Sequence, residues 1–204
     1  NGNWRLAERL GRHLAAAGDH LDALAPLLQA ADARALCGDY ALAAEVLDLR
    51  EDSLSKAQVP TEDERWGIGW LARHRVAQGR GDYADGTEWL EKLERGTSTH
   101  AWPIVEIRTM ALRGEVERLS GNYATALKVL TQAERKAMAL SVPRWLGDVR
   151  YLIATVLSEH GDLPSAERWV RRAMRDYEIC KHEVGSARSW MNLGLITTET
   201  GRHG

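Results

Sequence analysis

The side chains that most often carry out chemistry are thinly spread along this chain of 204 residues. Its two cysteines, Cys37 and Cys180, do not have the spacing of metal ligands, and no His-Glu-x-x-His segment occurs. The chain has no Gly-Lys-Ser, Gly-Lys-Thr or Gly-x-Gly-x-x-Gly segment, so the common phosphate-binding loops are missing. His13 and His20 flank an expected turn, but coincidence at the surface explains this pair better than a site does. The sequence therefore predicts neither an enzyme nor a metal or cofactor site.

A short turn signature recurs along the chain and sets its organisation. It is found at Gly38-Asp39-Tyr40, Gly81-Asp82-Tyr83, Gly121-Asn122-Tyr123 and Gly161-Asp162-Leu163. The glycines are 43, 40 and 40 residues apart, and Gly201 lies another 40 residues on. A fixed period of this length indicates a repeat array, whose usual product is an extended binding surface.

Each repeat is predicted to be a helix, a tight turn and a second helix. Apolar residues after each glycine recur in steps of three and four, and further helical stretches precede the glycines, at 65–78, 105–119, 146–160 and 186–200. Glycine can end the first helix in the left-handed conformation, and the Asp or Asn beside it can cap the second. We expect linkers at 52–63, 96–99 and 141–143, all too short to separate domains, and hence one array over 1–204.

These turns resemble those of the tetratricopeptide repeat family, with Gly121 followed by Ala126, Leu130 and Ala133 at that family's spacing. The resemblance implies an all-α, right-handed α-solenoid of antiparallel helix pairs, with a period of about 40 residues instead of the usual 34 or so. The Ala-rich segments 14–20 and 25–31 also loosely resemble the helical arms of bacterial signalling ATPases and kinases and of maltose-regulator-type activators. The implied function is a protein- or peptide-binding scaffold in a larger bacterial signalling or regulatory protein. The alternative is a small-molecule sensor with its ligand in the concave groove.

In the tetratricopeptide family the first helices line the concave face, and this implies the binding residues here. The candidates are Trp70, Arg75, Arg108, Glu115, Arg118, Tyr151, Thr155, Arg188 and Asn192. A guanidinium can hold a carboxylate in two hydrogen bonds, so the arginines are the expected anchors. The alternative is that these side chains only pair with Glu and Asp on neighbouring helices.

Composition limits the partners further. The net charge of −2 argues against nucleic acid, and no apolar run is long enough to span a membrane. The two distant cysteines predict no disulfide, as in a reducing cytoplasm. The chain opens on Asn1-Gly2 without Met, so we expect a piece of a longer protein. An apolar last helix predicts self-association, and a basic run on the helix before it is interpreted as a solvated outer face: Arg168, Arg171, Arg172 and Arg175.

Overall fold

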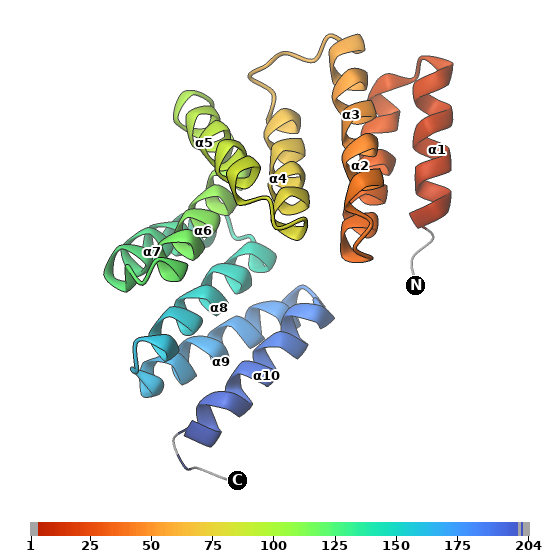
Figure 1. The fold of residues 1–204 in the computed structure, drawn as a ribbon. Helices are drawn as coiled ribbons and strands as arrows, with labels where there is room; N and C mark the ends of the chain where they lie inside the picture. Colours follow the sequence, from red (N-terminus) through yellow and green to blue (C-terminus); the bar gives the residue numbers. More distant parts are fainter. Residues whose placement is uncertain (1–3, 200, 202–204) are drawn as a thin grey trace. The chain divides into compact units, whose positions relative to one another are not determined.

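The fold is entirely helical, as expected, in the part of the chain that this computed structural model describes, residues 4–199 and 201. That part contains ten α-helices and no strand (Figure 1). The helices are α1 (Trp4–Ala17), α2 (His20–Leu36), α3 (Tyr40–Lys56), α4 (Glu64–Gly79), α5 (Tyr83–Thr99), α6 (Pro103–Leu119), α7 (Tyr123–Ala139), α8 (Pro143–Glu159), α9 (Leu163–Ile179) and α10 (Glu183–Glu199).

Two compact units divide the chain, Asn1–Val105 (unit 1) and Glu106–Gly204 (unit 2). In unit 1, α1 to α5 contact one another in chain order, and α1 also contacts α3 while α2 contacts α4. In unit 2, α7 to α10 contact one another in chain order, and α8 also contacts α10. Each unit is therefore built from near neighbours in sequence, as in a repeat array. That the whole of 1–204 behaves as one cooperative array stays a prediction.

The turn glycines have the conformation expected of them. Their φ angles are +79° at Gly38, +72° at Gly81, +76° at Gly121 and +91° at Gly161, in the left-handed region that favours glycine. The next residue closes each turn by donating its N–H to a carbonyl five residues back, at 2.8 to 3.0 Å. This pattern satisfies the free carbonyl groups at the end of the first helix.

The predicted caps of the second helices form in only two of these four turns. The side chains of Asp82 and Asp162 each accept a hydrogen bond at 3.1 Å from the backbone N–H three residues on. Asp39 instead pairs with Arg34, and Asn122 donates to a glutamate of the preceding helix. Competing side-chain partners therefore explain the two missing caps.

The linker expected at 96–99 is wrong, because α5 continues through Thr99. The hydroxyl groups of Thr97, Ser98 and Thr99 donate to carbonyls three or four residues back at 2.8 to 3.0 Å, which holds them inside the helix. Gly96 is needed there because a Cβ would lie 2.5 Å from Cζ3 of Trp102. The linker at 52–63 is shorter than expected, since α3 runs to Lys56, and Asp63 caps α4.

Small residues let the helices pack closely within each unit. One core of unit 1 contains Ala23, Leu27, Ala43 and Leu47, all essentially inaccessible to solvent. One core of unit 2 is built alike, from buried alanine, valine, isoleucine and leucine side chains of α6, α7 and α8. Cys37 and Cys180 are both free.

Candidate functional site

The expected binding residues lie on α4, α6, α8 and α10, which with α2 are the helices preceding the turn glycines (the first helices). Neighbouring first helices contact each other in both units, α2 with α4 and α8 with α10. Side chains three or four residues apart share one face of such a helix. The contacts that each expected residue makes on the next first helix therefore decide whether it is available to a partner.

Arg75 joins the two first helices of unit 1. Its Nη1 lies 2.6 Å from Oδ1 of Asp32, which belongs to α2. The two side chains are 40% and 39% exposed, so solvent screens the ion pair and it contributes little to stability. Arg75 is thus paired with a neighbouring carboxylate while remaining open to solvent.

Trp70 lies on a different side of α4 from Arg75. Its ring meets that of Trp102 edge to face, with centroids 5.5 Å apart, and Nζ of Lys92 lies 4.3 Å from its centroid. A Cβ built on Gly96 would come within 3.1 Å of Cζ3 of Trp70, so the half-buried ring fills the space that this glycine leaves. These contacts are those of a packing side chain, and Trp70 is not among the binding residues that we propose.

In unit 2, the expected residues on α6 contact one another or α8. Nη1 of Arg118 lies 2.5 Å from Oε1 of Glu159, and its Nη2 lies 3.8 Å from Oε1 of Glu115. The Arg118 side chain is only 15% exposed. The guanidinium carbon of Arg108 lies 4.5 Å from the ring centroid of Trp145, within range of a cation–π interaction.

The four expected residues on α8 and α10 lie together, with Arg188 exposed, Tyr151 and Thr155 half-buried and Asn192 buried at 9% exposure. The guanidinium carbon of Arg188 lies 4.6 Å from the ring centroid of Tyr151. One turn further along both helices, Nδ2 of Asn192 donates to Oγ1 of Thr155 at 3.4 Å, and that hydroxyl donates to the carbonyl of Tyr151 at 3.0 Å. The structure therefore brings together Tyr151, Thr155, Arg188 and Asn192.

Arg188 differs from Arg75 and Arg118 in its partners. It is exposed, and within residues 4–199 it stacks on Tyr151 without a carboxylate at ion-pair distance. A guanidinium that lies on an aromatic ring still directs its N–H groups sideways, in the plane of the guanidinium. Those hydrogens can therefore bind a carboxylate of a partner without first breaking an internal ion pair.

A buried ion-pair cluster, which the sequence did not reveal, links three helices of unit 2. Arg150 on α8 donates to Oε1 of Glu134 on α7 at 2.8 and 3.0 Å, and to both carboxylate oxygens of Asp176 on α9 at 2.9 and 3.1 Å. Burial raises the pKa of Asp176, although Arg150 opposes this rise. The repeat spacing does mark one member of the cluster. Glu134 and Glu51 both lie thirteen residues after a turn glycine, and both bind an arginine of the following first helix.

A second network of polar side chains, which the sequence did not predict either, holds the start of α10. Nδ1 of His182 accepts from the N–H of Gly185 at 2.9 Å and lies 2.9 Å from Nη1 of Arg144. Oδ1 of Asp148 accepts from Arg144 at 2.9 Å and from the Tyr177 hydroxyl at 2.7 Å. The pKa of His182 is lowered, mainly by burial and secondly by the charge of Arg144. The pKa of Tyr177 is raised, mainly by burial and secondly by the charge of Asp148. His182 is therefore a neutral cap whose Nδ1 has to stay unprotonated.

Arg50 is an unusual buried cation of unit 1. It is 2% exposed and stands where two later repeats have alanine, Ala133 and Ala173. Its Nη2 donates to the carbonyl of Arg65 at 2.9 Å, whereas its Nε and Nη1 have no partner among the described residues. Burial lowers the pKa of Arg50 to about 10. A Cβ at position 69 would lie 2.6 Å from Nη1, so Gly69 makes room for the guanidinium.

Within residues 4–199 and 201, no group of three or more His, Cys, Asp or Glu side chains could hold a metal ion. No described helix is long and apolar enough to cross a membrane.

Comparison with known proteins supports the fold without assigning a function. No family model matches the chain, and no curated protein matches it. A solved structure, that of BtubC (BKLC) from P. vanneervenii, is similar with a TM-score of 0.72 and 13% sequence identity, over 99% of this chain and 86% of that chain. At this identity the likeness shows the fold alone, that of an α-helical repeat array.

Proposed function

We propose that this chain is a protein- or peptide-binding repeat module, a non-catalytic scaffold within a larger cytoplasmic signalling or regulatory protein of bacteria. The observation that carries the proposal is the patch on α8 and α10, where an exposed Arg188 stacks on Tyr151 beside the hydrogen-bonded pair of Thr155 and Asn192. An arginine fixed on an aromatic ring, with polar groups one turn away, is the composition typical of residues that dominate binding energy.

Two features favour a carboxylate-bearing partner at this patch. Arg188 has no internal carboxylate to give up, as described above, and stacking on Tyr151 reduces the conformational entropy that binding would otherwise cost. Arg75 and Arg118 would each first have to leave Asp32 or Glu159. We therefore assign Arg188 the anchoring role and the two paired arginines a supporting one.

Site-specific photo-crosslinking in cells tests where the partner binds. A benzophenone side chain would replace Met191, which is exposed on α10 three residues after Arg188, and, as a control, Tyr83, which is exposed at the start of α5. The proposal predicts a discrete protein adduct at position 191 that weakens when Arg188→Ala is added. Adducts at position 83 alone, or an adduct at 191 that Arg188→Ala leaves unchanged, would contradict it.

A further inference from the structure

The charge of the chain is unevenly distributed between the two units. Residues 1–105 carry 12 Lys and Arg against 17 Asp and Glu, whereas residues 106–204 carry 15 against 12. The overall charge of −2 therefore hides a basic second half. Such an asymmetry between halves points to an acidic partner for the basic half.

Within unit 2 the basic side chains gather on the exposed sides of α7 and α9. The single acid of α7, Glu134, and one acid of α9, Asp176, are buried on Arg150 of α8. Both carboxylates therefore bind the same arginine of α8, while Glu178 of α9 stays exposed and Glu167 pairs with Arg171 on the helix surface. The cations left exposed on the two helices are Lys128, Arg135, Lys136, Arg168, Arg171, Arg172 and Arg175.

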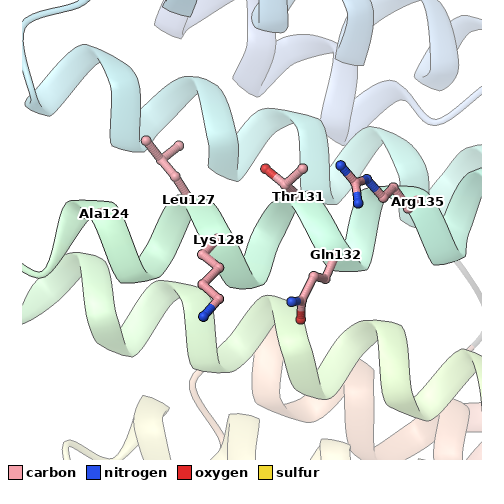
Figure 2. A pocket seen from close by; sticks show the side chains of 6 residues that line it. All are labelled: Ala124, Leu127, Lys128, Thr131, Gln132 and Arg135. Atoms are coloured by element: carbon pink, nitrogen blue, oxygen red, sulfur yellow. The ribbon is translucent and has the colours of Figure 1, made fainter.

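One of these helices also carries a shallow surface hollow, wide open to solvent, of about 390 Å³ (Figure 2). Its lining comes from one face of α7: Ala124, Leu127, Lys128, Thr131, Gln132 and Arg135. Lys128 and Arg135 are two turns apart, which corresponds to about 10 Å along the helix. Neither forms an ion pair with any residue among 4–199 and 201, although Lys136 beside them binds Glu106 at 3.1 Å.

We propose that this face, the exposed side of α7 with the arginines of α9, is a docking surface for an acidic segment of another protein. Lys128 and Arg135 would each take a carboxylate, while the Thr131 hydroxyl and the Gln132 amide can bind the backbone or side chains between them. Leu127 supplies an apolar contact at the same hollow. The surface lies on second helices and is thus separate from the patch around Arg188.

A peptide fits these observations better than nucleic acid does. A nucleic acid presents a continuous row of phosphates and favours a continuous basic stripe. Two isolated cations two turns apart, with a hydroxyl and an amide between them, instead match a few carboxylates spaced along a segment.

The test is fluorescence anisotropy with a short fluorescein-labelled peptide of alternating Glu and Ala, compared with its Gln and Ala twin. The acidic peptide should bind the whole chain and the twin should not. Lys128→Glu with Arg135→Glu should weaken binding at least about tenfold, because the substitutions remove both hollow cations and repel the ligand. Arg9→Glu with Lys181→Glu, which changes the net charge equally at exposed positions of α1 and the α9–α10 turn, should stay within about twofold.

Three results would overturn this assignment. The first is equal loss in the two double variants, which would mean that only overall charge matters. The second is unchanged binding by Lys128→Glu with Arg135→Glu when circular dichroism shows an intact fold. The third is that single-stranded oligonucleotide of equal charge binds tighter than the peptide. None of them bears on the patch at Arg188, which lies on the first helices α8 and α10 and is tested separately by crosslinking at position 191.

Discussion

Replacing Arg150 with Met removes the cation that lies between two buried carboxylates in unit 2. The side chain of Arg150 is 15% exposed, and those of Glu134 and Asp176 are 11% and 8% exposed. Removing one partner of a buried ion pair costs about 3–5 kcal/mol of unfolding free energy, because the remaining charge is left uncompensated. We expect a loss of this size at neutral pH for Arg150→Met, since two carboxylates then remain on α7 and α9.

The loss should shrink as the pH falls. Burial already raises the pKa of Asp176 above its ordinary value, and removing Arg150 removes the interaction that opposes the rise. An acid whose pKa is higher in the folded state takes up its proton there first, so lowering the pH toward the ordinary value of about 4 favours the folded variant. Arg150→Met combined with Glu134→Gln and Asp176→Asn carries no buried charge and should recover most of the stability.

Urea unfolding followed by far-UV circular dichroism measures these changes. Amide hydrogen exchange of α7, α8 and α9 should accompany it, because repeat arrays can unfold in parts. Two results would refute the reasoning: a loss below about 1 kcal/mol for Arg150→Met, as for a surface pair, or a triple variant no more stable than the single one.

Three further outcomes follow from the same structure. The pKa of His182 is lowered in the folded state, as is that of buried His74, so the unfolding free energy should fall as the pH drops below about 6.5. His182→Asn should reduce this slope when urea unfolding is repeated across the pH range, and an unchanged slope would contradict the assignment. Arg50→Met should raise the unfolding free energy by about 1 kcal/mol or more, and with it the melting temperature, because it removes a buried cation that forms no ion pair among the described residues. Calorimetry that shows earlier melting of the variant would contradict this. Trp190 and Leu195 are 62% and 61% exposed on α10, so the chain should self-associate through this helix; light scattering should show Leu195→Glu to be monomeric, and a wild-type monomer at millimolar concentration would count against it.

The repeat signature predicted most of the fold. Each turn glycine has φ above zero, and all the helices expected around the turns are present, because a glycine turn and a three-four apolar step are local properties of the sequence. The linker at 96–99 failed for a local reason too. Ser and Thr are frequent in loops, but here their hydroxyl groups donate to helix carbonyls instead. The close packing of Gly96 against Trp102, which also favours a helix at 96–99, is a tertiary contact that the local sequence does not reveal.

The candidate site was predictable in position but not in pairing. The pairs Tyr151 with Arg188 and Thr155 with Asn192 are each 37 residues apart, so repeat spacing alone brings them together. Whether an arginine pairs with a carboxylate of the same chain depends on single residues such as Glu159, which do not recur in every repeat. The burial of Arg150 was not predicted, because charged side chains are ordinarily solvated, although Glu134 shares its repeat position with Glu51.

Affinity of the partner captured at α10 tests the proposed binding patch most directly. Fluorescence anisotropy would compare the wild type with Arg188→Ala on α10 and Arg95→Ala on α5, two exposed arginines, the second 3.7 Å from a carboxylate oxygen of Glu91. Arg188→Ala should weaken binding by about 1–3 kcal/mol, roughly 5- to 150-fold, with an unchanged melting temperature. Arg95→Ala should stay within about twofold, as expected for a side chain outside the contact. Equal losses in the two variants, or no loss in either, would show that the first-helix face of unit 2 is not where the partner binds.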